Sequence, residues 1–126
     1  MTDKRVKVLI VDDDFISLEV MRAMLSHFQA AEILTAESGG EAFDVIMQQR
    51  PQLVLLDHQL PDFNGVQLYC KVHAELGDAT PLTAMVSGNP PADYEAECRA
   101  AGINHLLQKP LAPSDLAELM RIASAG

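Results

Sequence analysis

Hydrophobic residues follow two alternating patterns along this chain. Short runs of aliphatic and β-branched residues alternate with longer segments in which apolar residues recur every three or four positions. The short runs predict strands and the periodic segments predict helices. The expected strands cover residues 6–11, 33–36, 53–56, 82–86 and 104–108. The third run is wholly apolar, as is typical of a strand that is buried on both faces.

A helix is expected after each of these strands. The first, over residues 15–29, should place one apolar stripe on the core, formed by Leu18, Met21, Leu25 and Phe28. Ser38 and Glu41 fit a capping box at the start of the second, whose apolar residues are Ala42, Phe43, Ile46 and Met47. The remaining helices are expected over 65–76 with Gly77 as a stop, over 91–101 with Gly102 as a stop, and from Pro113 with Leu116, Leu119, Met120 and Ala123 inward.

Strict alternation of strand and helix predicts an α/β fold with a parallel sheet covered on both faces. The expected architecture is a doubly wound (βα)5 domain with an open, five-stranded sheet. A chain of 126 residues suits one domain, and no linker or repeat divides it. We therefore expect residues 1–126 to form a single unit.

Composition narrows the classes of partner. The formal net charge of −9 argues against direct binding of nucleic acid, which requires a basic surface. No run approaches the ~18 apolar residues of a membrane span, and the apolar run near the N-terminus is better explained by a strand than by a signal peptide. These features favour a cytoplasmic protein that does not enter membranes. Cys70 and Cys98 show no CxxC spacing and are expected to be reduced core residues, with a redox role as the alternative.

Polar residues follow four of the five predicted strands directly. Asp12, Asp13 and Asp14 follow the first, Asp57 follows the third, Ser87 the fourth and Lys109 the fifth. In open α/β sheets the ligand site lies beyond the carboxyl ends of the strands, so these side chains should converge at one edge. His58 follows Asp57 and is expected to be a solvated loop residue, with a place at the mouth of the site as the alternative.

Each of these residues also has an ordinary structural explanation. The three consecutive acids could cap the first helix, Asp57 could belong to a turn, and Lys109 could be a solvated surface residue. Convergence of all of them is harder to explain in that way. Clustered carboxylates need a countercharge, and an all-oxygen site suits Mg²⁺. Mg²⁺ and Lys109 would balance Asp12, Asp13 and Asp57, and would allow phosphorylation of Asp57, with Ser87 as a donor to the phosphoryl group.

The segments VLIVDDD, LVLLDHQLPDFNG, MVSG and LLQKPL, in this order, resemble the receiver (CheY-like) domains of bacterial two-component response regulators. The resemblance covers essentially the whole chain. It implies the strand order 2-1-3-4-5. It also implies that Asp57 accepts a phosphoryl group from a phosphohistidine, and that Lys109 and Ser87 act on that group. Asp12, Asp13 and Asp57 would bind Mg²⁺ together with the backbone carbonyl of Gln59, and the bond before Pro110 would often be cis.

The resemblance also implies partners. These are a sensor histidine kinase or a histidine phosphotransfer protein as the donor, and a downstream effector protein or domain. The chain would be a stand-alone regulator or the receiver part of a larger one. Asn104 and His105 replace the acidic pair common in receivers that dimerise on DNA, so we expect a monomer or a weak dimer. Leu106 stands three residues before the lysine, where the family usually has Tyr or Phe, and leucine cannot make the conformational move of that aromatic ring.

Two other functions fit parts of the pattern. A phosphohydrolase with an aspartyl nucleophile would normally carry a second acid two residues after it, but Gln59 occupies that position. A receiver-like scaffold that acts without phosphorylation is the second alternative. Transfer of phosphate to Asp57 distinguishes the receiver from the scaffold, and turnover of a small phosphate ester would indicate the hydrolase.

Overall fold

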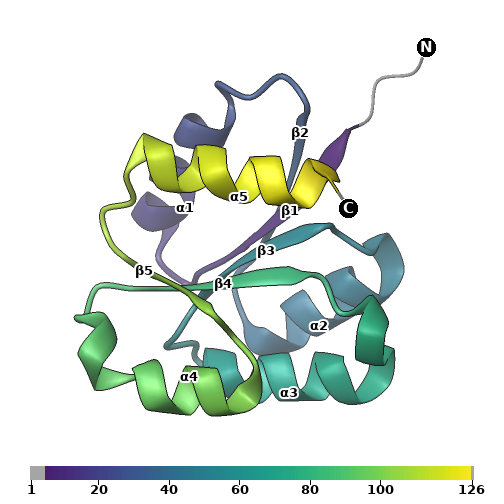
Figure 1. The fold of residues 1–126 in the computed structure, drawn as a ribbon, viewed down its shortest axis with the longest axis vertical. Coiled ribbons are helices and arrows are strands. Elements are labelled where there is room, and N and C mark those ends of the chain that lie inside the picture. Colours follow the sequence, from purple (N-terminus) through teal and green to yellow (C-terminus); the bar gives the residue numbers. More distant parts are fainter. Residues whose placement is uncertain (1–4, 126) are drawn as a thin grey trace.

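Five parallel strands form the centre of the molecule. The computed structural model describes residues 5–125 and shows one sheet with helices on both faces (Figure 1). The strands are β1 (Val6–Val11), β2 (Ala31–Ala36), β3 (Leu53–Asp57), β4 (Leu82–Ser87) and β5 (His105–Gln108). Their order is β2-β1-β3-β4-β5, and all neighbouring strands are parallel. The predicted fold class and strand order are confirmed.

Two layers of helices cover the sheet. The helices are α1 (Phe15–Leu25), α2 (Gly39–Gln49), α3 (Gly65–Leu76), α4 (Glu95–Ala101) and α5 (Pro113–Ala125), with single 3-10 turns η1 (Gly77–Ala79) and η2 (Pro91–Asp93). Helices α1 and α5 lie on one face, and α2, α3 and α4 lie on the other (Figure 1). Among the described residues, no helix has the length and the apolar character needed to cross a membrane.

Each face of the sheet has its own hydrophobic core. Alternate residues of β1 divide between the two: Val8 and Ile10 pack under α1 and α5, whereas Leu9 and Val11 pack under α2, α3 and α4. The apolar stripes predicted for the first and last helices are confirmed, since their helical members are buried: Leu18, Met21, Leu25, Leu116, Leu119, Met120 and Ala123. These two cores hold the strand ends in register.

The predicted first helix was too long. Helix α1 ends at Leu25, and the hydroxyl of Ser26 donates a hydrogen bond of 2.6 Å to the carbonyl of Ala23. Such local side-chain bonds compete with continued helix. Phe28 still packs on the core, but from the turn that follows the helix.

The predicted helix over residues 91–101 is divided in the structure. The turn η2 is followed by Tyr94, whose ψ of 4° departs from helical geometry, and α4 begins at Glu95. The break places the Tyr94 side chain in the core, where 3% of its surface stays exposed.

The capping box predicted at Ser38 forms only in part. The Ser38 hydroxyl accepts from the backbone N–H of Glu41, but the Glu41 carboxylate accepts from the N–H of Glu37 instead of from that of Ser38. A complete capping box occurs at the start of α3, between Asn64 and Gln67.

The two cysteines differ in their surroundings. Cys98 is fully buried, and burial raises the pKa of its thiol to about 11, which disfavours the reactive thiolate. This confirms the expectation of a core residue. Cys70 is exposed on α3, so the same expectation was wrong for Cys70.

Gly65 provides a test of the packing between β3 and α3. A Cβ atom at this position would lie 2.7 Å from the carbonyl oxygen of Asp57 and 2.9 Å from Sδ of Met85. We expect Gly65→Ala to lower the free energy of unfolding by about 1–3 kcal/mol in urea denaturation, because the backbone of Asp57 must shift. The control is Gly88→Ala, whose Cβ would meet nothing within 4 Å and which should change stability by less than about 0.5 kcal/mol. Equal effects of the two changes would contradict the close contact.

Candidate functional site

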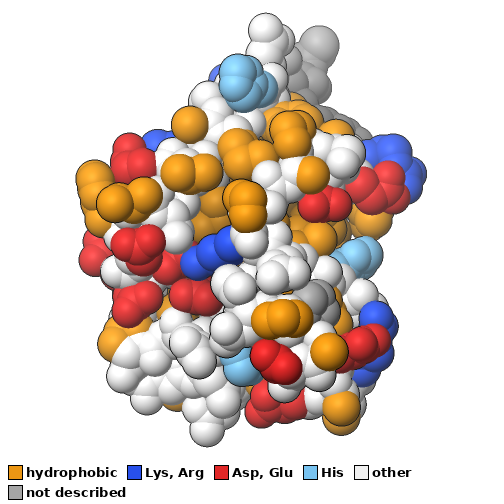
Figure 2. All heavy atoms as spheres, turned by 90° about the vertical axis from the view of Figure 1, so that its left-hand side faces the viewer, with side chains coloured by type: hydrophobic (Ala, Val, Ile, Leu, Met, Phe, Trp, Pro, Cys, Tyr) orange, Lys and Arg blue, Asp and Glu red, His pale blue; other side chains and the backbone are white. Residues whose placement is uncertain are grey.

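Three carboxylates meet at the carboxyl edge of the sheet. One oxygen from each of Asp12, Asp13 and Asp57 lies within 4.8 Å of the others. The side chain of Asp12 is 1% exposed and that of Asp57 is 12% exposed, while Asp13 is open to solvent. Figure 2 looks onto the side of the molecule at the left of Figure 1 and shows acidic side chains gathered beside a basic one. The convergence predicted from the strand ends is confirmed for these acids.

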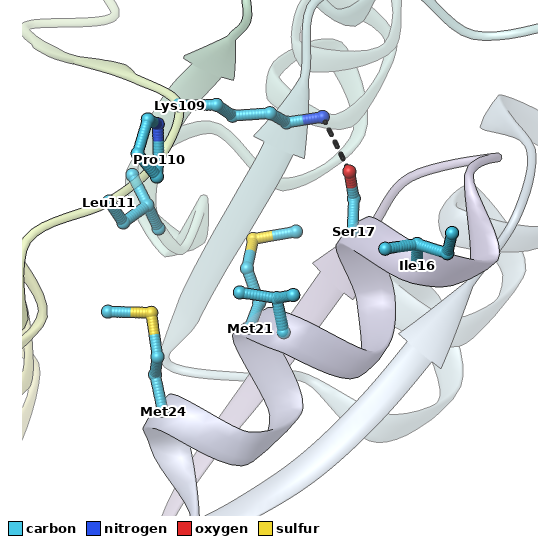
Figure 3. A pocket seen from close by; sticks show the side chains of 8 residues that line it. Ile16, Ser17, Met21, Met24, Lys109, Pro110 and Leu111 are labelled. Carbon is cyan, nitrogen blue, oxygen red and sulfur yellow. Dashed lines mark hydrogen bonds between the residues drawn. The ribbon is translucent and has the colours of Figure 1, made fainter.

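Lys109 supplies positive charge to this cluster. Its Nζ lies 2.6 Å from Oδ2 of Asp12 and 4.0 Å from Oδ1 of Asp57. It also donates a hydrogen bond of 3.4 Å to the hydroxyl of Ser17 on α1 (Figure 3). The backbone N–H of Lys109 donates to the carbonyl of Ser87, and the following bond to Pro110 is cis, as the resemblance implied. Lys109 is therefore an ion-paired residue and not a solvated one.

The carboxyl group of Asp57 has a raised pKa. Burial is the largest cause and the negative charge of Asp12 is the second, while Lys109 opposes both, and the resulting pKa is about 6. The charged form of Asp57 is thus disfavoured in the folded protein. A further cation at this position would favour it.

Asp14 has a different role from the two acids before it. Its side chain accepts hydrogen bonds from both the backbone N–H and the hydroxyl of Ser17, at 3.2 and 2.9 Å, and caps α1. These bonds with Ser17 are the main reason why the pKa of Asp14 is lowered. The capping interpretation is therefore correct for Asp14, whereas Asp12 and Asp13 face the cluster.

Ser87 and Gln59 lie beside the cluster. Ser87 ends β4 and is 3% exposed, and its hydroxyl accepts from the N–H of Asn89 at 3.1 Å. The sheet register pairs Asp57 with Val86, the residue before Ser87. The N–H of Gln59 lies 3.5 Å from Oδ1 of Asp57. All the predicted site residues thus lie at the same edge, and the roles of Ser87, Lys109 and Gln59 stay predictions.

The loop after Asp57 is held by a residue that the sequence analysis did not identify. The carboxylate of Asp62 accepts from the N–H groups of Gly39 and Gly40, at 2.8 and 2.9 Å, at the start of α2. These bonds lower the pKa of the Asp62 carboxyl group, and the bond from Gly40 is the largest cause. An acidic residue near the start of a helix is stabilised by the helix dipole, which ties this loop to α2. The sequence did contain a signal for this contact, namely an acidic residue in the loop and two consecutive glycines at the expected start of a helix.

His58 is not the solvated loop residue that we expected. Its ring stacks on that of Tyr94 with the centroids 5.0 Å apart and the planes at 21°, and Nε2 lies 3.4 Å from Oε1 of Glu97. Only 17% of its side chain is exposed. The residue beside Asp57 therefore packs on the start of α4.

A groove of about 250 Å³ lies next to the acidic cluster. It runs between α1 and the segment after β5, and it is lined by Ile16, Ser17, Val20, Met21, Met24, Lys109, Pro110 and Leu111 (Figure 3). Lys109 belongs to both the groove and the cluster. The rim of the groove is apolar and open, since Ile16 is 70% exposed and Val20 is 49% exposed.

The acidic cluster is chemically suited to a hard divalent cation. All three side chains offer carboxylate oxygens, which suit Mg²⁺ better than softer metals. With Lys109 beside them, the three carboxylates offer an all-oxygen site for such an ion.

Comparison with known proteins identifies the family. The family model described as the response regulator receiver domain matches residues 8–121. Response regulator MprA of Mycolicibacterium vanbaalenii is 33% identical over 116 residues, which are 92% of this chain and 49% of that protein. The chain thus spans about half the length of this relative.

Solved structures agree with this assignment. The CheY-like receiver domain protein of Methanospirillum hungatei superposes with a TM-score of 0.83 at 29% identity, covering 96% of this chain and 94% of that one. A two-component response regulator of Cytophaga hutchinsonii has a TM-score of 0.86 at 20% identity, covering 98% and 99%, and shows the fold alone. A phosphohydrolase of similar topology does not account for the family match. The chain belongs to the response regulator receiver domains, the phosphoacceptor modules of two-component signalling, and Asp12, Asp13 and Asp57 form its acidic pocket.

Proposed function

We propose that Asp57 accepts a phosphoryl group from a phosphohistidine of a sensor histidine kinase or a histidine phosphotransfer protein. The observation that carries the proposal is the convergence of Asp12, Asp13 and Asp57 within 4.8 Å beside the ammonium of Lys109. In this transfer the bond between phosphorus and the donor imidazole nitrogen breaks, and a bond from phosphorus to a carboxylate oxygen of Asp57 forms. The imidazole nitrogen keeps the electron pair of the broken bond and takes up a proton.

Lys109 and Ser87 are the proposed catalytic partners of Asp57. The ammonium of Lys109 already lies 4.0 Å from Asp57 and offsets the charge that the phosphoryl oxygens add. The hydroxyl of Ser87 now accepts from the N–H of Asn89. By turning toward Asp57 it would donate to a phosphoryl oxygen and release that N–H.

Mg²⁺ is the cation that we propose for the pocket. The carboxylates of Asp12, Asp13 and Asp57 and the backbone carbonyl of Gln59 would hold it, a set of oxygen ligands that suits this ion. When bound, it supplies positive charge that offsets the crowded carboxylates and the phosphoryl oxygens.

The groove beside α1 is the proposed docking site of the phosphohistidine protein. The donor imidazole must reach Asp57, so the surface around it must cover the rim of the acidic pocket. Lys109 belongs to the pocket and to the groove alike, and Ile16 and Val20 on the open rim offer apolar side chains to a partner. These two residues lie one helical turn apart on the same face of α1.

The wider setting is part of the same proposal. We assign residues 1–126 to one receiver domain that works in the cytoplasm as a monomer or a weak dimer. Phosphorylation would change its affinity for a downstream effector protein or domain. The net charge of −9 supports action through protein partners rather than through direct contact with nucleic acid.

Phosphorylation of Asp57 is tested by intact-protein mass spectrometry after incubation with phosphoramidate. With Mg²⁺ we expect the wild type to gain one phosphoryl group, and Asp57→Asn to gain none because the amide is a poor nucleophile. Omitting Mg²⁺ should slow labelling by about tenfold or more. Labelling of Asp57→Asn at the wild-type rate would contradict the assignment of the acceptor. A wild type that gains nothing under any condition would favour the scaffold alternative.

The raised pKa of Asp57 predicts a pH-dependent effect on stability in the metal-free protein. In the unfolded chain Asp57 has its ordinary pKa of 3.8, whereas in the folded protein its pKa is about 6. The wild type therefore loses stability as the pH rises from about 4 to about 6, and Asp57→Asn does not. With a chelator present, we expect the variant to be more stable by about 3 kcal/mol at about pH 7 and to lose this advantage below about pH 4.

Urea denaturation at several pH values measures this difference. The control is Asp44→Asn, which changes an exposed aspartate on α2 and should show no such dependence. A wild type that is as stable as Asp57→Asn at every pH would contradict the raised pKa.

The docking proposal predicts that changes in the groove slow phosphoryl transfer from a phosphohistidine protein but not from phosphoramidate. The donor in this test is a phosphohistidine domain that labels the wild type. We expect the double variant Ile16→Ser, Val20→Asn to accept the phosphoryl group from it about tenfold or more slowly, because apolar contact area is lost. Labelling by phosphoramidate should stay within about twofold of the wild type, because the small donor does not use the groove.

Cys70→Ser is the control for this test, since Cys70 is exposed on α3, on the other face of the sheet. If the double variant slows both donors equally, the defect lies in the chemistry. If it slows neither, the donor docks elsewhere.

A further inference from the structure

Leu106 raises the question of how the signal leaves the acidic pocket. It lies on β5, three residues before Lys109, and it packs against the hydrophobic cluster under α2, α3 and α4. Its aliphatic side chain has neither a hydroxyl group nor a ring that could follow Ser87 inward. If a side chain with a ring connects Asp57 with the face formed by α4 and β5, it comes from another element.

Tyr94 has the contacts that such a connection requires. It stands between η2 and α4, and its ring is buried in the same cluster against which Leu106 packs. Its hydroxyl donates to the carbonyl of Leu107 on β5 at 3.3 Å. Its backbone carbonyl accepts from the N–H of Cys98, in the first turn of α4. One residue thus joins the start of α4 to β5.

His58 connects Tyr94 with the phosphoacceptor. Its backbone is fixed at the end of β3, because its N–H donates to the carbonyl of Val86 and its carbonyl accepts from the N–H of Gly65. Its ring leaves the pocket and rests on α4, stacked on Tyr94 and 3.4 Å from the carboxylate of Glu97. Its Nδ1 is buried and has no hydrogen-bond partner among the described residues.

These contacts join the two chain segments that phosphorylation would move relative to each other. The peptide after Ser87 leads through exposed Gly88, Asn89 and Pro90 to η2 and then to Tyr94. If Ser87 turns toward a phosphoryl group on Asp57, the N–H of Asn89 loses its partner and this segment can shift. His58 stays with β3, so the shift must change the contact between His58 and Tyr94.

We infer that the stacked pair His58–Tyr94, with Glu97, transmits phosphorylation of Asp57 to helix α4. The inference rests on the proposed function. The three residues are positioning residues, because they act on α4 and do not touch the reacting atoms. The aromatic ring that receivers usually carry on β5 would here be provided from the start of α4, and the surface of α4 would present the phosphorylated state to the effector.

The test compares amide hydrogen exchange in α4 with and without beryllofluoride and Mg²⁺, which together imitate a stable phosphoryl group. For the wild type we expect exchange in residues 95–101 to change by about fivefold or more, which is within the range of ordinary allosteric coupling. In Tyr94→Leu and His58→Ala this ligand-dependent change should fall below about one third of its wild-type size. Labelling of Asp57 by phosphoramidate should continue at about the wild-type rate.

Two further variants separate transmission from simple packing. Tyr94→Phe keeps the ring and should retain most of the change in α4. Tyr69→Leu is the matched control, because Tyr69 packs against the same hydrophobic cluster but stacks on His73, with the centroids 6.1 Å apart, and not on His58. It should leave the change in α4 intact. Glu97→Ala alters an exposed residue and should weaken the change even if Tyr94→Leu fails to fold.

Each failure has a distinct signature. If the wild type is labelled by phosphoramidate but His58→Ala and Glu97→Ala keep the full change in α4, the inference is wrong and the proposed function stands. If Tyr69→Leu abolishes the change as completely as Tyr94→Leu does, the effect is general packing and the inference is also wrong. If the wild type takes up no phosphoryl group at all, the proposed function fails and the inference falls with it.

Discussion

The ion pair between Lys109 and Asp12 is the interaction on which the rest of the site depends. A carboxylate that is 1% exposed is costly to bury unless it is paired, and the ammonium lies 2.6 Å away. The same lysine lies 4.0 Å from Asp57 and limits the rise in the pKa of that carboxyl group. It comes from the end of β5, whereas the acids follow or end β1 and β3. The pocket can therefore form only when the sheet is complete.

The charge of the pocket favours an incoming cation. With Lys109 alone, the three neighbouring carboxylates have more negative charge than the site can neutralise, and Asp57 is held with a pKa of about 6. This arrangement disfavours the pocket without a cation. A bound divalent cation would relieve the repulsion between the carboxylates. The two apolar cores on either side of the sheet hold the strand ends in place against this repulsion.

The proposed docking groove and the proposed route to α4 lie on opposite faces of the sheet. The groove beside α1 adjoins Lys109 on one face of the sheet, and the pair His58–Tyr94 leads to α4 on the other (Figure 1). A donor protein on α1 would leave the surface of α4 free for an effector. Asp57 ends β3, the central strand of the sheet, and so lies between these two faces.

The sequence by itself determined the order of elements, the two-sided sheet and the gathering of Asp12, Asp13 and Asp57, because apolar periodicity defines strands and parallel strands end at one edge. It did not determine where α1 ends, because local bonds such as that from the Ser26 hydroxyl to Ala23 decide the last turn. Nor did it determine that Cys70 is exposed, because the packing of α3 on the sheet decides which of its residues face solvent. Least of all could it show that His58 lies against Tyr94. That contact joins residues far apart in the chain, and only the packing of α4 on the finished sheet decides which side chains meet.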